Sequence, residues 1–385
     1  MRTHYQPKNN KFCEVGNNAM KVLLLVAEFP PTTYAGLATY SYNVAKHLQR
    51  NNDVKVSVLV NCLPFRRYIS NLRYTYKVIK KINKLKKEKK LEIIYAITFR
   101  PEFTAIGLYA KILHLPFVSH GVGLDIYSSN PMFIQARKTA YSISEQLVCG
   151  ASFQKEMISH EGAPYEKINV VLGGVDTEVF RPMHGERYGF RRHFDVEDRF
   201  VLLSLGRLVK RKGFDDALKA LTYLGDIDDI FLLIVGEGPE KPFLTKLVEK
   251  LSLSERVRFL NFLSTNYLPA VYNTADLFIA PFRVIGKDME GTPLVVQEAL
   301  SCGTPVISTN TAGVPELIEN GKSGFTVNPN SPEKIAEKIR LLYENRKLYA
   351  KMATEARRRA QRLLDWKVAV GKTEKVLKKA LVNKR

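Results

Sequence analysis

The sequence predicts an α/β protein of two domains, each with a doubly wound parallel sheet covered by helices on both faces. Short apolar runs alternate with amphipathic stretches along the chain, as expected for buried parallel strands joined by helices. The chain has 385 residues, which favours two domains of ordinary size over one. Two of the apolar runs, VLLLVAEF and FVLLSLG, lead into a glycine-containing loop and then a helical pattern, as the first strand of such a domain does.

The expected strands fall into two series along the chain. The first series covers 21–26, 54–60, 91–96, 116–119, 145–149 and 168–172, and the second covers 200–205, 230–235, 256–260, 276–280, 304–308 and 324–327. We therefore predict a polar N-terminal extension over 1–19, a Rossmann-like domain over 20–180 and a second one over 181–364. Residues 173–194, GGVDTEVFRPMHGERYGFRRHF, are rich in glycine and charge and are interpreted as the linker.

The composition excludes several classes of protein. Hydrophobic residues make up 45% of the chain and charged residues 25%, which is typical of a globular protein. No apolar run approaches the ~18 residues that span a bilayer, and the first residues lack the apolar segment of a signal peptide. The cysteines lack the spacing of a zinc site or of a disulfide framework; they are Cys13, Cys62, Cys149 and Cys302. We expect a cytoplasmic protein.

The formal net charge of +21 is concentrated in two stretches. Residues 66–90 contain eleven Lys or Arg and one acidic residue, and residues 341–385 contain fourteen and four. The first stretch also has apolar residues at helical spacing, which predicts a basic amphipathic helix; they are Ile69, Leu72, Tyr76, Ile79, Ile82 and Leu85. Such a helix either exposes a solvated face or docks on anionic lipid. We expect no nucleic acid as a partner, because no nucleic-acid-binding motif accompanies the charge.

Two glutamates flank the start of an apolar helix in DMEGTPLVVQEALSCGTPVIS. Glu298 lies among apolar residues, so its carboxylate should be partly buried and should have a partner. Thr292 and Pro293 are expected as the N-cap and the first helical residue, and Gly303 as the C-terminal stop. The unpaired N–H groups of such a helix start suit a phosphate. With Glu290, the pattern favours a ligand that carries hydroxyls and phosphate, such as a nucleotide sugar. The alternative is a surface glutamate at a helix start and a core glutamate with a structural partner.

Other candidate residues follow predicted strands, where ligands bind in doubly wound sheets. Arg207 and Lys212 lie after the strand 200–205 and could hold a pyrophosphate, although Lys212 in KRKG also fits a solvated turn. His120 ends a strand in LPFVSHGVGLD, and it either contacts substrate and exchanges protons or is structural. Gly36 would let the backbone approach a ligand closely.

Together these stretches resemble the retaining glycosyltransferases of family 4, over about residues 21–366. The most specific matches are GRLVKRKGFDDALKAL, LLIVGEGP, YNTADLFIAPF, EGTPLVVQEALSCGTPVIST and AGVPELIENGKSGFTV; PPTTYAGLATYSYNVAKHL and SHGVGLD match more loosely. The resemblance implies the GT-B fold, in which two Rossmann-like domains face each other across a cleft. The first would be the acceptor side and the second the nucleotide-sugar donor side. Residues 365–385 would form a basic helix that crosses back to the first domain.

The resemblance also implies roles for the candidate residues. Arg207 and Lys212 would contact the donor diphosphate. Glu298 would hold the nucleotide ribose and Glu290 the hydroxyls of the sugar. His120 would lie beside the reacting sugar and Gly36 would face the donor phosphates. The remaining substrate contacts would be the backbone of Gly291, Thr292, Pro293, Leu294 and Val295 around phosphate and sugar, and Phe262 and Leu263 at the base.

The implied reaction is transfer of a hexosyl group from a nucleotide diphosphate sugar to an acceptor hydroxyl, with retention of configuration and without a metal or other cofactor. The acceptor would be a glycan or a lipid-linked molecule. The enzyme would then be peripheral on the inner face of the membrane, through residues 66–90 and 341–385. If the terminal helix packs on the first domain, its lysines would join those of 66–90 on one face.

The alternatives are a nucleotide-sugar epimerase or phosphorylase of the same fold, a two-carboxylate glycoside hydrolase that uses Glu290 and Glu298, and a basic nucleic-acid-binding protein. Asp226-Ile227-Asp228 matches the DxD pattern of metal-dependent glycosyltransferases, but it precedes a strand, so we interpret it as structural. The chain departs from the family pattern at Ala35, Gly173, Asn261 and Phe282. Because Asn261 borders the expected base site, no nucleotide is assigned.

Overall fold

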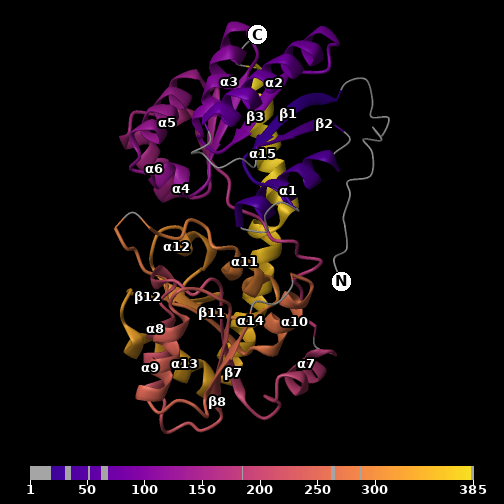
Figure 1. Cartoon of the computed structure of the whole chain (residues 1–385). Coiled ribbons are helices and arrows are strands. Elements are labelled where there is room, and N and C mark those ends of the chain that lie inside the picture. The colour runs from indigo at the N-terminus through magenta and orange to yellow at the C-terminus, as the bar shows by residue number, and fades with distance from the viewer. Residues whose placement is uncertain are drawn as a thin grey trace. The chain divides into compact units, whose positions relative to one another are not determined.

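The computed structural model describes residues 19–30, 36–50, 53–61, 68–183, 185–261, 265–286 and 288–382 (Figure 1). The chain forms two compact units. The first contains the described residues up to Val171 together with those from Ala369 onward, and the second is Leu172–Val368. Each unit contains a six-stranded sheet in its described part, and the strand pairs are parallel. The predicted α/β architecture is therefore confirmed.

The sheet of the first unit has the strand order β2-β1-β3-β4-β5-β6. Its strands are β1 (Met20–Val26), β2 (Val54–Val60), β3 (Ile93–Ile97), β4 (Phe117–Gly121), β5 (Gln146–Cys149) and β6 (Ile168–Val170). Its helices are α1 (Gly36–Gln49), α2 (Tyr68–Lys87), α3 (Pro101–Ile112), α4 (Leu124–Tyr127), α5 (Pro131–Ile143), α6 (Ser152–His160) and the part of α15 (Trp366–Val382) from Ala369 onward. The central strands are buried on both faces, which explains why they are apolar runs without alternation.

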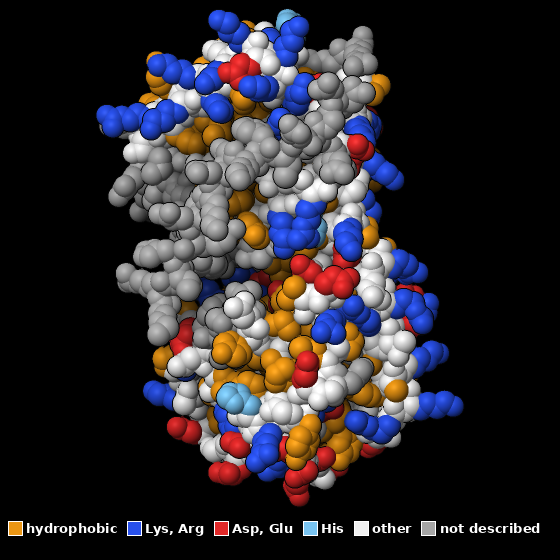
Figure 2. Space-filling view, turned by 90° about the vertical axis from the view of Figure 1, so that its right-hand side faces the viewer, with side chains coloured by type: hydrophobic (Ala, Val, Ile, Leu, Met, Phe, Trp, Pro, Cys, Tyr) orange, Lys and Arg blue, Asp and Glu red, His pale blue; other side chains and the backbone are white. Residues whose placement is uncertain are grey.

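Helices α2 and α15 pack on opposite faces of this sheet. Ile94 and Ala96 of β3 belong to a core cluster with Ile82 of α2. Side chains alternate between the faces of a strand, and Tyr95 between them hydrogen-bonds Thr373 of α15 instead. The sheet therefore separates the two basic helices, and the expectation that their lysines share one face is wrong. On the face that Figure 2 shows, Lys and Arg side chains are numerous at the top, over the first unit, and few Asp or Glu side chains lie among them there.

Helix α2 confirms the basic helix predicted within 66–90, but its buried side differs from the predicted stripe. Val78 and Ile82 are buried, whereas Leu72 is 69% exposed and Tyr76 is 58% exposed. Asn71, a polar residue, is buried in place of Leu72. None of the helices in the described ranges combines the length and the hydrophobicity needed to cross a bilayer.

The sheet of the second unit has the order β12-β11-β10-β7-β8-β9. Its strands are β7 (Phe200–Leu205), β8 (Ile230–Val235), β9 (Val257–Leu260), β10 (Leu277–Ala280), β11 (Val306–Thr309) and β12 (Gly324–Val327). Its helices are α7 (Arg187–His193), α8 (Phe214–Thr222), α9 (Lys241–Lys250), α10 (Leu268–Thr274), α11 (Leu294–Ser301), α12 (Val314–Leu317), α13 (Pro332–Glu344) and α14 (Arg346–Arg359). The chain order reverses between the neighbours β7 and β10, and ligands bind outside the carboxyl ends of strands at such a switch point.

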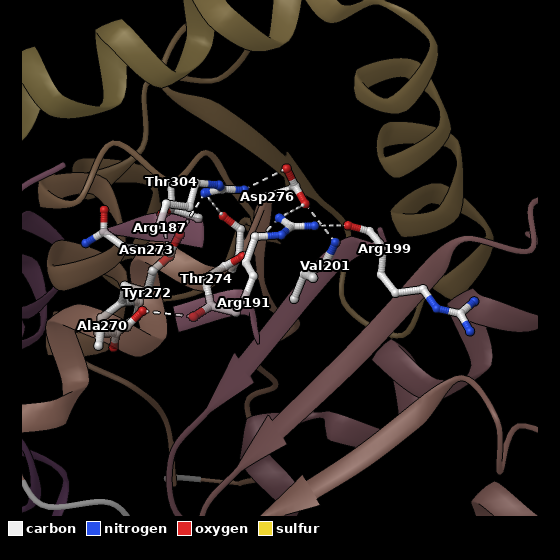
Figure 3. A network of polar contacts seen from close by, with 11 residues as sticks. Arg187, Arg191, Arg199, Val201, Ala270, Tyr272, Asn273, Thr274, Asp276 and Thr304 are labelled. Carbon is white, nitrogen blue, oxygen red and sulfur yellow. Dashed lines mark hydrogen bonds and ion pairs between the residues drawn. The ribbon is translucent and has the colours of Figure 1, made fainter. Parts of the chain in front are cut away.

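Residues 173–194, interpreted above as a linker, are instead part of the second unit. Within them α7 is fixed by Arg187 and Arg191, whose guanidinium groups lie 2.9 and 3.1 Å from the carboxylate of Asp276. Figure 3 shows both arginines directed at this carboxylate. The charge of this segment therefore stabilises the fold, and the division between the units falls after Val171.

Candidate functional site

The candidate site of the second unit lies where the loops after β7 and β10 meet. Gly213 ends the turn η2 (Lys210–Lys212) with a left-handed φ of 67°. A Cβ atom at Gly213 would lie 2.0 Å from the carbonyl oxygen of Pro281, so only glycine lets the two loops approach this closely. The approach places the ammonium of Lys212 over the ring of Phe282, 4.9 Å from its centre.

Lys212 forms an ion pair with Glu290. Its Nζ lies 3.0 Å from Oε1 of Glu290, and Nε of Arg211 lies 2.8 Å from the same oxygen. Burial alone would raise the pKa of Glu290, but the two cations outweigh it and hold that pKa below its ordinary value. Glu290 is therefore a carboxylate at neutral pH. The alternative that Lys212 is a solvated lysine in a turn is wrong, because its side chain is only 10% exposed.

Arg211 was not predicted as a site residue. It lies in the same KRKG turn, where three consecutive cations give no indication of which one points inward. Besides Glu290 it contacts Asp288 at 3.5 Å, and its carbonyl oxygen accepts a hydrogen bond from the backbone N–H of Arg283. Arg211 thus attaches the turn after β7 to the loop after β10.

The carboxylate of Glu298 has an uncharged hydrogen-bond partner. The hydroxyl of Tyr272 on α10 donates a hydrogen bond of 2.7 Å to its Oε2. Burial raises the pKa of Glu298 to about 7, against the smaller opposing effects of the Tyr272 hydrogen bond and the Lys212 charge. The tyrosine is held by edge contacts with the rings of Phe180 and Phe278, at centroid distances of 6.0 and 5.6 Å. Tyr272 lies in the YNTADLFIAPF stretch but was not singled out from the sequence.

Helix α11 begins one residue later than predicted. Pro293, rather than Thr292, is the N-cap, the helix starts at Leu294, and no side chain caps its first turn. The first N–H groups of a helix have no acceptor within the helix, so those of Leu294 and Val295 are available for an anion. Gly303 follows the helix with a φ of 74°, which confirms the predicted C-terminal stop.

Arg207 lies at the same edge of the sheet but stands apart from the other charges. Its side chain is exposed, and it forms no ion pair with any described residue. The structure thus brings Lys212, Glu290 and Glu298 together and leaves Arg207 solvated beside them. Gly291 and Thr292 lie in the loop before α11 and are partly buried. Phe262 and Leu263, expected at the base, lie outside the described residues.

The other two candidates, His120 and Gly36, belong to the first unit. His120 on β4 is 1% exposed, and its Nδ1 lies 2.5 Å from the hydroxyl of Tyr95. Burial lowers the pKa of His120 to about 3, so the ring is neutral. Gly36 begins α1, and a Cβ atom there would meet no atom within 4 Å. The fold of the unit therefore imposes no requirement for glycine at this position.

Asp125 of the first unit is a residue that sequence analysis missed. Its carboxylate accepts backbone hydrogen bonds from Phe99 at 2.7 Å and Val122 at 2.9 Å, and so joins the loops after β3 and β4. Burial raises its pKa to about 6, although these hydrogen bonds oppose the shift. Its only sequence signal is its place in the SHGVGLD stretch. Thr98, which precedes Phe99, has a φ of 104°, a strained conformation for a β-branched residue.

The described residues contain neither a metal-binding cluster nor an exposed thiol. No group of three His, Cys, Asp or Glu side chains in the described ranges could hold a metal ion. Asp226 of the DxD pattern pairs with Arg340 at 2.6 Å, at the end of the sheet opposite the site. Cys149 and Cys302 are buried thiols outside any disulfide, and burial raises the pKa of the Cys302 thiol. Cys13 and Cys62 lie outside the described residues.

A stretch of the second unit matches a known family, and the chain is similar to several known proteins. Residues 189–359 match the family described as glycosyl transferases group 1. The GDP-mannose-dependent alpha-(1-6)-phosphatidylinositol monomannoside mannosyltransferase of Mycobacterium tuberculosis is 33% identical over 192 residues, which are 49% of this chain and 50% of that protein. The chain thus spans about half the length of such curated relatives. An uncharacterized glycosyltransferase of Methanocaldococcus jannaschii, MJ1607, is 24% identical over 346 residues, which are 82% of this chain and 87% of that protein.

Among solved structures, Alr3699/HepE of Anabaena in complex with UDP has a TM-score of 0.76 at 21% identity, covering 93% of this chain and 100% of that one. Sucrose-phosphate synthase of Thermosynechococcus elongatus has a TM-score of 0.73 at 15% identity, with 94% and 100% covered. These likenesses show the fold. Residues 189–359 are thus similar to the glycosyl transferases group 1 family, and the two sheets of the chain have the GT-B fold of these solved structures.

Proposed function

We propose that the protein is a retaining glycosyltransferase that moves a hexosyl group from a nucleotide diphosphate sugar to an acceptor hydroxyl. One observation carries the proposal. At the switch point of the second sheet, the Lys212–Glu290 ion pair lies beside Glu298 and the uncapped start of α11. Cations and free N–H groups suit a diphosphate, and carboxylates suit hydroxyls.

We propose a separate task for each charge of the site. Lys212 and Arg207 contact the diphosphate and stabilise the charge that develops on it as the glycosidic bond breaks. Glu290 accepts hydroxyls of the sugar. When Lys212 turns from Glu290 to the diphosphate, Arg211 still neutralises this carboxylate, since it contacts the same oxygen at 2.8 Å. Glu298 accepts hydroxyls of the ribose, while Tyr272 fixes its orientation.

The identity of the donor is tested by binding. The mycobacterial relative is named as GDP-mannose-dependent, whereas HepE was solved with UDP, so the two point to different nucleotides. Thermal unfolding in the presence of GDP-, UDP- and ADP-sugars identifies the donor, because a ligand at 100 times its Kd stabilises the folded state by about 2.7 kcal/mol. If none of these raises the unfolding midpoint, the proposed function fails.

A two-carboxylate glycoside hydrolase is the second candidate, because Glu290 and Glu298 have pKa values shifted in opposite directions. Such an enzyme gives no role to Lys212, Arg211 or the start of α11. Nucleotide release that requires an acceptor, without hydrolysis of oligosaccharides, supports the transferase. Glycoside hydrolysis without nucleotide release supports the hydrolase. Turnover of a donor alone would indicate an epimerase, and dependence on phosphate a phosphorylase.

We also propose that no metal takes part, because Lys212 and Arg207 supply the positive charge that a metal would supply at the diphosphate. Turnover should therefore be unchanged in excess EDTA. Retention of the anomeric configuration is tested by NMR of the anomeric proton of the product. The transferred sugar should have the same anomeric configuration in the product as in the donor.

The acceptor is proposed to be lipid-linked and reached from the cytoplasmic face of the membrane. Within its described side chains, α2 carries seven basic residues and no acidic ones, and Leu72 and Tyr76 are exposed among them. Exposed apolar side chains within a basic helix face suit an anionic bilayer. The basic part of α15 lies on the other face of the sheet, so α2 alone is proposed as the docking surface in this unit.

Sedimentation with phosphatidylserine vesicles tests this surface. Binding at low salt should be lost at roughly 0.5 M salt, where charges are screened within a few Å. Replacing Leu72 and Tyr76 by Ser should weaken vesicle binding at low salt. The same replacement of Val382, an exposed apolar residue of α15, should not weaken it. Vesicle binding that persists at high salt would contradict a mainly electrostatic attachment. The absence of binding at low salt would contradict it as well.

A further inference from the structure

The second unit has a cavity of about 680 Å³ at the end of its sheet opposite the site described above. Ala275 and Asp276 precede β10, Gly303 and Thr304 precede β11, and all four line the cavity. Helix α14 forms the other wall. The volume is within the range of pockets that hold small molecules, about 300–1,000 Å³. Nothing in the proposed transfer reaction uses this end of the sheet.

The cavity is lined by four arginines and one carboxylate; the arginines are Arg187, Arg346, Arg357 and Arg358. The carboxylate, Asp276, is already neutralised by Arg187 and by Arg191 behind it, as Figure 3 shows. It also accepts a hydrogen bond of 2.7 Å from the backbone N–H of Val201. Arg358 forms an ion pair with Glu355. The excess positive charge of the lining therefore comes from Arg346 and Arg357, and its one acidic side chain is not available to balance them.

Several hydrogen-bond donors of this lining lack an acceptor in the described part of the chain. Arg346 is exposed at the edge of the cavity and makes no hydrogen bond or ion pair there. Its guanidinium lies 4.7 Å from the ring centre of Tyr349 and 5.3 Å from that of Phe200. Arg357 donates through Nη1 only, to the carbonyl oxygens of Phe180 and Ser301 and to Oγ of Ser301. Its Nε and Nη2 remain available.

Tyr349 adds a third donor. Its hydroxyl makes no hydrogen bond within the described ranges, yet its ring is largely buried, and the charges that act on the hydroxyl are those of Asp276, Arg187, Arg346 and Arg191. The hydroxyl therefore lies within electrostatic range of these charged groups, of which Asp276, Arg187 and Arg346 line the cavity. Ala275, Ala350 and Ala353 supply small apolar surface beside the charged groups, which suits the carbon skeleton of a ligand.

We propose that this cavity binds a phosphorylated small molecule, with the phosphate held by Arg346, Arg357 and Tyr349. Guanidinium groups bind phosphate through paired hydrogen bonds, and a doubly charged anion compensates the excess charge better than a single carboxylate does. The ligand is distinct from the nucleotide sugar, whose diphosphate is proposed to bind at the carboxyl ends of the strands. The inference therefore goes beyond the proposed function.

Calorimetric titration with inorganic pyrophosphate tests the proposal. The titration uses the full chain with Lys212→Gln, so that the donor diphosphate site is weakened and the remaining binding reports on the cavity. We expect one pyrophosphate to bind per chain. Arg346→Gln should weaken this binding at least about tenfold, because it removes charge-assisted hydrogen bonds. Tyr349→Phe keeps the ring and should weaken it less, by about two- to tenfold.

Lys351→Gln is the matched control. It removes one positive charge from the exposed surface of the same helix, and Lys351 does not line the cavity. This change should alter the affinity less than about twofold. Thermal unfolding confirms that each variant folds. The proposal is overturned if pyrophosphate does not bind in the Lys212→Gln background, or if Arg346→Gln and Lys351→Gln have equal effects.

Discussion

Replacing Glu298 by Gln should make the protein more stable at neutral pH and less able to bind its donor. Burial raises the pKa of Glu298 from an ordinary 4.5 to about 7. A glutamine has nearly the same shape and can still accept the hydrogen bond from Tyr272, which is 2.7 Å long in the wild type. The variant therefore removes the cost of the buried negative charge and leaves the packing intact.

The magnitude follows from the linkage between pKa and stability. Because the pKa of Glu298 is higher in the folded state, the wild type loses stability as pH rises from the unfolded pKa to the folded one. The shift from 4.5 to about 7 corresponds to about 3 kcal/mol, at 1.36 kcal/mol per unit. The Gln variant should match the wild type below about pH 4.5 and exceed it by up to about 3 kcal/mol above about pH 7.

Urea unfolding of both proteins between pH 4.5 and 8 measures this difference. Glu290→Gln is a control of opposite sign. Lys212 and Arg211 hold the pKa of Glu290 low, so its carboxylate stabilises the fold above the unfolded pKa, and this contribution is lost as pH falls through the folded pKa. Glu290→Gln should therefore destabilise the protein at neutral pH. If the stabilities of Glu298→Gln and the wild type differ by a constant amount across the range, the reasoning about Glu298 is refuted.

Three further substitutions test other features of the second unit. Arg207→Ala should lower turnover by roughly 100-fold or more if the cation stabilises the leaving diphosphate, and unchanged kcat with intact folding removes it from the mechanism. Gly213→Ala should destabilise the fold by more than about 1 kcal/mol in urea unfolding, because of its left-handed φ of 67° and the 2.0 Å approach of a Cβ atom to Pro281; no loss of stability contradicts the close contact. Gly173→Asn should lower stability by about 1 kcal/mol or more, since its Cβ atom would lie 3.2 Å from Nε2 of the buried Gln297 and the amide beyond it must displace that side chain; an unchanged or higher melting temperature argues against this.

The strands were predictable because the central ones are buried on both faces, and such strands are apolar runs that any reader of the sequence can find. The buried side of α2 could not be predicted, because the order of its lysines and apolar residues is compatible with more than one buried face of the helix. Contact with α3 and β3 selects Val78 and Ile82 and leaves Leu72 exposed. Only the tertiary contacts of α2 determine which face is buried.

The charged site shows a similar limit. The sequence indicated Lys212, Glu290 and Glu298, since each lies near a strand end or a helix start. Nothing in the sequence indicated Tyr272, whose hydroxyl donates a hydrogen bond to Glu298. In the sequence, such a tyrosine cannot be distinguished from any other aromatic residue of the core. The supposed linker was misread for a related reason, as the carboxylate that Arg191 satisfies is 85 positions away in the sequence.

The first unit draws its residues from two segments that are separated by the whole of Leu172–Val368. Val376, Leu377 and Ala380 of α15 are buried, and Thr373 hydrogen-bonds Tyr95. During translation the nascent first sheet must therefore wait for its covering helix while the intervening residues are made, roughly 10–40 s at 5–20 residues per second. Over that interval an apolar patch is open to chaperones and to aggregation, so slow-translating codons in the second unit should lower the yield of folded protein.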